Sequence, residues 1–369
     1  MPGPFRPVST AAPADPEFNA VSCPSAAACI VVGSAKAPDG RTVPLAERWN
    51  GRVWRVETTQ APPGGGSLQS VSCVSAEACS AVGSARTGPH PGQMPPLAES
   101  WHGGGWIPHA AAVRGAAADL ADVSGTAPAF CMALGGRLHP DGSSATLMER
   151  WDGRRWTQLA TPAGRDMASV SCTAATSCVA VGSDPAGDFG VWSQAWDGSA
   201  WRIQANGDAS TGELADAVSC PSPGACTVVG SGYFYDLSPT AERWDGAHWR
   251  IEDAVEPSDA DTDGDGLVAV SCVSATARVA VGSYRDVELA DDNSETLAEK
   301  WDGSAWAILP VPRFTRTEGT FSDISCTSAS SCMAVGETDD QRAAAGRTES
   351  WPLAERWNGR AWTVLAIRT

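Results

Sequence analysis

An all-β fold is predicted for this chain: a seven-bladed β-propeller with four antiparallel strands in each blade. Three features predict it: a unit of roughly 50 residues occurs seven times, each copy carries a tryptophan pair, and each copy carries an apolar run that ends at a glycine. Four short strands per copy leave little chain for linkers, which argues against separate domains. We expect a tail or linker over residues 1–16 and the propeller over residues 17–369, with repeats starting near residues 17, 67, 119, 167, 214, 266 and 320.

The tryptophan pairs mark the hairpin between the last two strands of each copy. Asn-Gly or Asp-Gly lies between most partners, and these dipeptides favour a two-residue type I′ turn. With that turn, Trp49 would lie opposite Arg52. Glu47 would lie opposite Trp54, so both rings and the carboxyl group would share a face that packs against the adjacent blade; seven sugar-stacking platforms are the alternative. The pairs are Trp49/Trp54, Trp101/Trp106, Trp151/Trp156, Trp196/Trp201, Trp244/Trp249, Trp301/Trp306 and Trp357/Trp362.

The four strands of a copy follow from sequence patterns. In the first copy we expect strand a at FNAVSC, strand b at IVVGS, strand c at PLAERW and strand d at RVWRVE. Strand a carries small residues, as an innermost strand should, and strand b is apolar on both faces, as expected between neighbouring sheets. The glycine of strand b, Gly33 here, indicates close backbone approach or a bulge. The uniform a–b and c–d turns would lie at one end of each blade, and the b–c and d–a connections would form a variable-loop face at the other.

Ten of the 12 cysteines form C-x5-C pairs between strands a and b. A zinc site needs four converging ligands, usually with two to four residues between neighbours, whereas these pairs lie on separate blades. Local disulfides are therefore favoured, and they indicate an oxidising compartment. Gly125 replaces the partner of Cys131 and Arg278 replaces the partner of Cys272, so both thiols should be free. The predicted disulfides are Cys23–Cys29, Cys73–Cys79, Cys172–Cys178, Cys220–Cys226 and Cys326–Cys332.

Charge and hydropathy exclude several partners. The net charge of −17, from 43 acidic and 26 basic residues, repels the phosphates of nucleic acids and anionic lipids. No apolar run approaches the roughly 18 residues of a membrane span, so we expect no direct membrane insertion. The N-terminus lacks the features of a signal peptide, so either the signal was removed or the chain is cytosolic; the repeated disulfides favour an extracellular, secreted protein.

The repeated signature, VSCPSAAACIVVGS followed by LAERW and WNGRVW in the first copy, resembles the Cys- and Trp-rich repeats of secreted actinobacterial proteins. The organisation of residues 17–369 is also similar to that of seven-bladed propellers of the kelch and lectin type. The resemblance implies an extracellular propeller.

No catalytic motif is found in the sequence. HExxH, G-x-S-x-G and the P-loop are absent, and the five histidines form no ligand spacing. The glutamate of LAERW recurs in six copies, with Gln194 in the fourth, and a residue present in nearly every blade is more often structural than catalytic. We expect no enzyme, with a glycosidase-like or lactonase-like propeller as the less favoured alternative. The recurring residues are Glu47, Glu99, Glu149, Glu242, Glu299 and Glu355.

Aromatic residues that break the repeat gather in the variable loops of blades 4–7, near acidic residues. The matching loops of blades 1–3 have no aromatic residue. Aromatic faces stack on sugar rings, and carboxylates accept hydrogen bonds from hydroxyl groups. The predicted ligand-binding residues are Phe189, Tyr233, Phe234, Tyr235, Tyr284, Trp351, Asp291 and Asp292.

An acidic segment, DADTDGDG, matches the first half of a calcium loop in its D-x-D-x-D-G spacing. Val270 stands where an EF-hand has a glutamate, and a solvated acidic loop is the other interpretation. Calcium is the one cofactor that the sequence suggests, with Asp259, Asp261, Asp263 and Asp265 as ligands.

The sequence therefore predicts an extracellular binding module with lectin-like carbohydrate binding through the variable-loop face. A protein–protein interaction scaffold that uses the same face is the alternative, so the partner is a glycan or a cell-surface protein. A shallow face binds weakly, and affinity would come from multivalency or attachment to a larger secreted assembly.

Overall fold

The computed structural model confirms the predicted fold class, a seven-bladed β-propeller whose blades are sheets of four antiparallel strands. It describes residues 6–7, 14–86, 95–113, 117–139, 141–162, 166–183, 190–204, 214–232, 238–258, 260, 266–285, 294–314, 318–340 and 349–367. These described residues contain no helix, and hence none able to cross a membrane.

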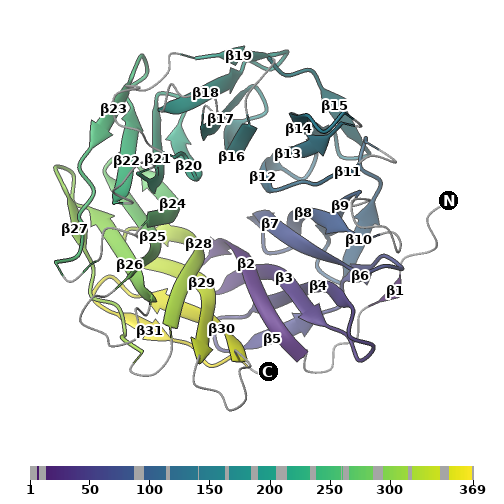
Figure 1. The fold of residues 1–369 in the computed structure, drawn as a ribbon, viewed down its shortest axis with the longest axis horizontal. Helices are drawn as coiled ribbons and strands as arrows, with labels where there is room; N and C mark the ends of the chain where they lie inside the picture. The colour runs from purple at the N-terminus through teal and green to yellow at the C-terminus, as the bar shows by residue number, and fades with distance from the viewer. Residues whose placement is uncertain are drawn as a thin grey trace. The chain divides into compact units, whose positions relative to one another are not determined.

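Two compact units divide the chain. The first contains the described residues up to Ala180 together with Gln194–Ile203, and the second contains Val181–Ser193 together with the described residues from Gln204 to Ile367. Blade 4 contributes residues to both units. Figure 1 shows the four strands of each blade side by side in chain order, from strand a to strand d.

The first three blades belong to the first unit. Blade 1 consists of β2 (Ala14–Ser25), β3 (Ala28–Lys36), β4 (Thr42–Trp49) and β5 (Trp54–Glu57). Blade 2 consists of β7 (Gly66–Ser75), β8 (Ala78–Ala85), β9 (Pro96–Trp101) and β10 (Trp106–His109). Blade 3 consists of β12 (Asp122–Ala127), β13 (Phe130–Leu138), β14 (Ser144–Trp151) and β15 (Trp156–Leu159), and β11 (Ala117–Ala118) also pairs with β13.

The remaining blades repeat the same order. Blade 4 consists of β16 (Asp166–Ala174), β17 (Ser177–Ser183), β18 (Val191–Trp196) and β19 (Trp201–Ile203). Blade 5 consists of β20 (Ala217–Ser222), β21 (Ala225–Ser231), β22 (Pro239–Trp244) and β23 (Trp249–Glu252). Blade 6 consists of β24 (Gly266–Ser274), β25 (Ala277–Arg285), β26 (Ser294–Trp301) and β27 (Trp306–Ile308). Blade 7 consists of β28 (Glu318–Ser328), β29 (Ser331–Asp340), β30 (Glu349–Trp357) and β31 (Trp362–Val364).

The glycine of strand b is required by the strand beside it. A Cβ atom on Gly83 would lie 2.0 Å from the carbonyl oxygen of Ser67, and the equivalent glycines of five other blades meet a backbone carbonyl oxygen in strand a or just before it. Strand a also has a register shift at this level in β2, β7, β24 and β28. The predicted close approach and the predicted bulge therefore both occur.

The hairpin between strands c and d has a different register from the predicted one. Trp49 lies directly opposite Trp54, so the expected pairing of Trp49 with Arg52 is wrong. Glu47 lies opposite Val56 rather than opposite Trp54. Both pairings shift by two residues, which preserves the side of the sheet, so the two rings and the Glu47 carboxyl group still share a face.

The side chain that opens the loop explains this register. The side-chain oxygen of Asn50 accepts the backbone N–H groups of Arg52 and Val53, both at 3.1 Å, which closes a four-residue loop instead of a two-residue turn. Gly51 supplies the positive φ of 89° that the loop needs. The same pair of side-chain bonds is made by Asp152, Asp197, Asp245, Asp302 and Asn358.

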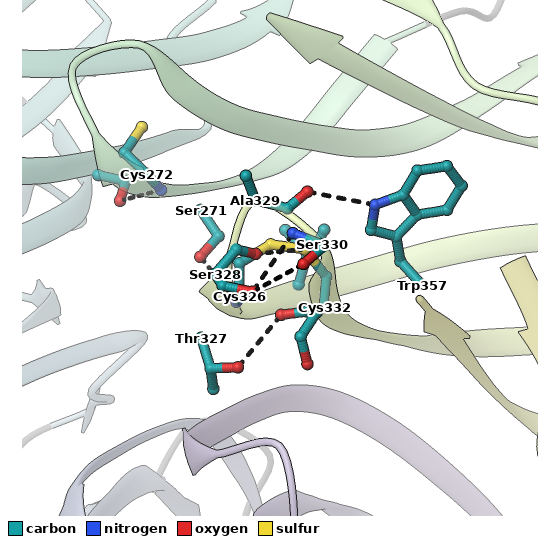
Figure 2. Close-up of a disulfide and its surroundings, with 12 residues drawn as sticks. Ser271, Cys272, Cys326, Thr327, Ser328, Ala329, Ser330, Cys332 and Trp357 are labelled. Carbon is teal, nitrogen blue, oxygen red and sulfur yellow. Dashed lines mark hydrogen bonds between the residues drawn. A yellow bond between two sulfur atoms is a disulfide. The ribbon is translucent and has the colours of Figure 1, made fainter. Parts of the chain in front are cut away.

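The paired tryptophans are core residues. Ring centroids lie 5.5 to 5.9 Å apart within each pair, and 13 of the 14 rings are buried, with Trp301 half-buried. The Trp101 ring donates its N–H group to the Ala76 carbonyl oxygen in the a–b turn at 3.1 Å, and Figure 2 shows the equivalent bond from Trp357 to Ala329. The c–d loop and the a–b turn therefore lie at the same end of a blade, as expected, and the packing interpretation holds.

Hydrogen bonds between first strands join consecutive blades within each unit. In five places, the serine that precedes the first cysteine position accepts the backbone N–H group of that position in the next blade, at 2.9 or 3.0 Å. Asp122 adds a second link, because one carboxylate oxygen accepts from Ser70 of blade 2 and the other from Ser169 of blade 4. The small polar residues of strand a are thus used to connect blades.

One buried indole N–H group has an acceptor that its equivalents lack. Trp249 of blade 5 donates to the Ser193 hydroxyl group of the preceding blade at 2.9 Å. Trp156 has no hydrogen-bond partner for its N–H group among the described residues, and Ala98, with which it shares a hydrophobic cluster, occupies the position equivalent to Ser193.

We expect Ser193→Ala to destabilise the protein by about 1–3 kcal/mol, because the buried Trp249 N–H group loses its partner. The complementary change, Ala98→Ser, should stabilise it by about 1 kcal/mol by supplying an acceptor to Trp156. Denaturant unfolding of both variants measures these effects. An unchanged midpoint for Ser193→Ala would contradict the assignment.

Candidate functional site

The variable-loop face is described only in part. Its described sections in the second unit include the ends of the β25–β26 and β29–β30 hairpins and the connection that follows β27. Of the predicted ligand-binding residues, Tyr284 and Trp351 lie in these sections. The others, Phe189, Tyr233, Phe234, Tyr235, Asp291 and Asp292, lie outside the described residues, as do the predicted calcium ligands Asp259, Asp261, Asp263 and Asp265.

Tyr284 is a packing residue in this arrangement. Its side chain is buried and belongs to a hydrophobic cluster with Leu267, Leu297 and Trp306. Its hydroxyl group accepts a hydrogen bond of 3.0 Å from the Arg313 guanidinium group, which lies in the connection to blade 7. The ring therefore fixes that connection to blade 6 and does not present a free face to a ligand.

Trp351 has the opposite environment. It lies within β30, directly opposite Thr338 of β29, and 39% of it is exposed. On the other side of the same hairpin, the Ser350 hydroxyl group donates to the Asp339 carboxylate. The exposed indole face therefore shares its side of the hairpin with the Thr338 side chain, whereas the Asp339 carboxylate and the Ser350 hydroxyl group lie on the opposite side.

The opposite end of each blade carries the disulfides. All five predicted bonds are present, each between residues whose Cα atoms lie 3.9 or 4.0 Å apart across the a–b hairpin. Figure 2 shows the Cys326–Cys332 bond, with the Cys326 N–H group donating to Ser271 of the preceding blade at 2.9 Å. Five such bonds indicate an oxidising environment.

The two remaining cysteines are free, as predicted. Cys131 is buried, donates to the Ser80 hydroxyl group at 3.2 Å, and has its pKa raised to about 11 by burial. Burial likewise raises the pKa of Cys272 to about 11. Both thiols therefore stay protonated at neutral pH and are poor nucleophiles.

Gly125→Cys is expected to form a sixth disulfide. Gly125 lies directly opposite Cys131, and a Cβ atom at Gly125 would lie 2.8 Å from the Cys131 sulfur atom. Thiol titration of the unreduced, denatured protein should fall from two groups to one, and the free energy of unfolding should rise by about 2 kcal/mol. A count of three thiols in the variant would show that the bond does not form.

Arg278 makes an ion pair where other blades have a disulfide. Its side chain is only 1% exposed, and its two terminal nitrogens contact the Glu252 carboxylate of blade 5 at 2.6 and 3.1 Å. Its guanidinium carbon also lies 4.1 Å from the centroid of the Trp301 ring. In the sequence, Arg278 was noted only because it replaces the second cysteine of a C-x5-C pair. A long charged side chain in place of a small one was the signal that this position needs a partner of opposite charge.

The glutamate repeated in strand c connects consecutive blades. Glu149 of blade 3 accepts the N–H groups of Ala112 and Val113, which follow blade 2, at 3.0 and 3.1 Å. Glu99 accepts from Gln60 in the same way, and Glu299 accepts from Val255. Each of these carboxyl groups fixes the connection that precedes its own blade. This is a structural role, as expected for a residue that recurs in nearly every blade.

Burial makes these carboxyl groups weak acids. Loss of solvation raises the pKa of Glu47 and Glu299 to about 7 and that of Glu99 and Glu355 to about 8, and it also raises the pKa of Glu149. Backbone N–H donors partly offset this effect at Glu99, Glu149 and Glu299. Neither carboxyl oxygen of Glu355 has a hydrogen-bond partner among the described residues.

A small cavity of about 90 Å³ lies at the disulfide end of blades 2 and 3. There the Ser100 hydroxyl group lies 2.9 Å from His102 Nε2 and 2.6 Å from His109 Nε2. The His109 ring packs on Trp151 at 4.4 Å, and burial together with the charge of His102 lowers the pKa of His109. The described residues contain no group of three side chains able to hold a metal ion.

Among the comparisons with known proteins, only the one with solved structures finds a match. No family model matches the chain, and no curated protein matches it. Among solved structures, it is similar to "YCF48 bound to D1 peptide" with a TM-score of 0.55 and 14% sequence identity, over 96% of this chain and 97% of that one. At this level of identity the likeness shows the fold alone.

Proposed function

We propose that this chain is a non-enzymatic, extracellular binding module that holds a glycan on the variable-loop face of blades 4–7. The exposed Trp351 ring is the observation that carries the proposal. An exposed indole on a strand presents a rigid apolar face on which a sugar ring can stack, and the Thr338 side chain lies on the same face. The five disulfides support the compartment, because such bonds persist in oxidising surroundings.

A non-catalytic role agrees with how the chain uses its repeated carboxylates. Glu99, Glu149 and Glu299 accept hydrogen bonds from backbone amides, so each of these carboxyl groups has a role in the fold. The calcium site at residues 259–265 stays a prediction.

Trp351→Ala should weaken glycan binding by about 1–2 kcal/mol, a factor of roughly 5–30, because the stacking surface is lost. Binding is measured on a glycan array with the wild-type chain and then by titration with the glycan found. Leu138→Ala is the matched control, since Leu138 is 51% exposed at the end of the equivalent hairpin of blade 3. Unchanged binding by the Trp351 variant, with an unchanged melting temperature, would refute this site.

A protein partner on the same face is the second candidate. It is favoured by one finding, that the similar solved structure is described as bound to a peptide. A larger secreted assembly would offer such a partner. Trp351→Ala should then reduce binding to protein partners while the glycan array shows no specific ligand.

A further inference from the structure

The connection between blades 1 and 2 already accepts an added strand. Residues Gln60–Ala61 form β6, which lies against β10 of blade 2, and Arg6–Pro7 form β1, which pairs with β6 in antiparallel fashion. Figure 1 shows β1 and β6 beside each other next to blade 2. A short extended segment from elsewhere in the chain is thus held by the backbone of the connection.

The connection between blades 2 and 3 is built in the same way. Ala112 follows the strand d tryptophan of blade 2 by the same number of residues as Gln60 follows the strand d tryptophan of blade 1. Both residues donate their N–H groups to the strand c glutamate of the next blade, Ala112 to Glu149 at 3.0 Å and Gln60 to Glu99 at 3.3 Å. The two connections are therefore anchored equivalently.

The second connection borders an open groove of about 460 Å³, a volume within the range of about 300–1,000 Å³ for ligand pockets. Ala110–Ala112 line one wall, and Arg155–Gln158, which include most of the edge strand β15, line the other. Ala110, Ala112, Thr157 and Gln158 are exposed, so small side chains and an open strand edge face the space.

Arg155 gives this groove a charge that the first connection lacks. Among the described residues that line the groove it is the only charged one, whereas Gly105 occupies the equivalent position in blade 2. Its side chain is 80% exposed, and its Nε atom lies 3.8 Å from Asp152, so that ion pair is weak. The net charge of −17 is spread over the whole chain and is screened beyond about 8 Å at physiological ionic strength, so Arg155 determines the local preference.

We propose that the groove between Ala110–Ala112 and Arg155–Gln158 binds an extended peptide segment of a partner protein by strand addition, with an acidic side chain of the peptide paired to Arg155. Main-chain hydrogen bonds would supply most of the affinity, and the arginine would supply the preference for a carboxylate. This site lies at the edge of blade 3 and is independent of the variable-loop face.

Short random peptides displayed on phage, selected against the full chain, test the proposal. The selected peptides should carry Asp or Glu at a shared position, and binding should fall about tenfold in Ala112→Trp and in Thr157→Trp, which fill the groove from opposite walls. Ala168→Trp, on an exposed position of strand a, is the control and should bind normally. Arg155→Glu should reverse the preference from acidic to basic peptides.

Two results would overturn the proposal. One is a selection whose peptides bind both groove-filled variants as well as the wild type. The other is selected peptides that lose binding in Trp351→Ala, which would place them on the variable-loop face. Loss of glycan binding in Trp351→Ala with retained peptide binding separates the two sites, so each proposal can fail alone.

Discussion

Glu252→Ala is expected to lower the free energy of unfolding by about 3–5 kcal/mol, because it leaves the Arg278 guanidinium group buried without its counter-charge. Arg278 is 1% exposed and Glu252 is 8% exposed at the side chain, so water cannot readily replace the lost carboxylate. The remaining Thr227 hydroxyl group, 3.0 Å from Arg278, is neutral and cannot compensate.

Chemical denaturation measures this effect, and blade 1 provides a matched control. Glu57 pairs with Arg48 at 2.8 Å, as Glu252 pairs with Arg243 at 3.1 Å. In the blade that follows Glu57, however, the position of Arg278 is occupied by the disulfide-bonded Cys79. Glu57→Ala should therefore cost at most about 1 kcal/mol. Adding Arg278→Met to Glu252→Ala should restore much of the loss. Equal effects of the two glutamate substitutions would contradict a special role for the buried pair.

Stability is expected to decrease between about pH 5 and about pH 8 because of the buried glutamates. Their pKa values are raised to about 7 or 8 in the folded chain, from an ordinary value of 4.5. Above pH 4.5 the unfolded chain releases these protons while the folded chain retains them. The contribution of these glutamates to the free energy of unfolding is therefore complete below their ordinary pKa and is lost as the pH rises through their pKa in the folded chain. The expected loss is several kcal/mol in total.

Burial also raises the pKa values of Glu149 and Asp216, so these two groups act in the same direction as the four glutamates. The pKa values of the loop aspartates Asp152, Asp197, Asp245 and Asp302 are lowered, so these groups stay ionised throughout this range. The pKa of His109 is lowered, so the folded chain favours the neutral imidazole ring. As the pH falls below about 6.5, His109 therefore reduces the stability that the glutamates increase.

Blade 4 shows how to remove the effect, because it carries Gln194 at the same position. A chain in which Glu47, Glu99, Glu299 and Glu355 are all replaced by glutamine should lose less stability over this range than the wild type. Glu355→Gln alone should stabilise the protein at about pH 8, since neither Glu355 oxygen has a partner among the described residues. Denaturant midpoints across pH test this. A wild-type profile that rises with pH would contradict the assignment.

Only two of the predicted ligand-binding residues can be compared with the described structure. Trp351 is exposed, as a binding residue must be, whereas Tyr284 is buried. Sequence position alone could not separate them, because both lie near the loop end of a strand. Their difference arises from Arg313 and from the hydrophobic cluster around Tyr284, which are distant in sequence.

The sequence by itself determined the blades, their strands and their disulfides, because each depends on residues that are close along the chain. Alternating apolar positions, Cys-x5-Cys spacing and Asn/Asp-Gly loops act within one hairpin and need no other blade. Only the tertiary structure decided the partners of residues that reach across blades. Glu149 binds amides 36 and 37 residues away, and Arg278 binds Glu252 26 residues away. Such pairs form because burying a charge requires a partner, and packing of one blade on the next determines which partner lies within reach.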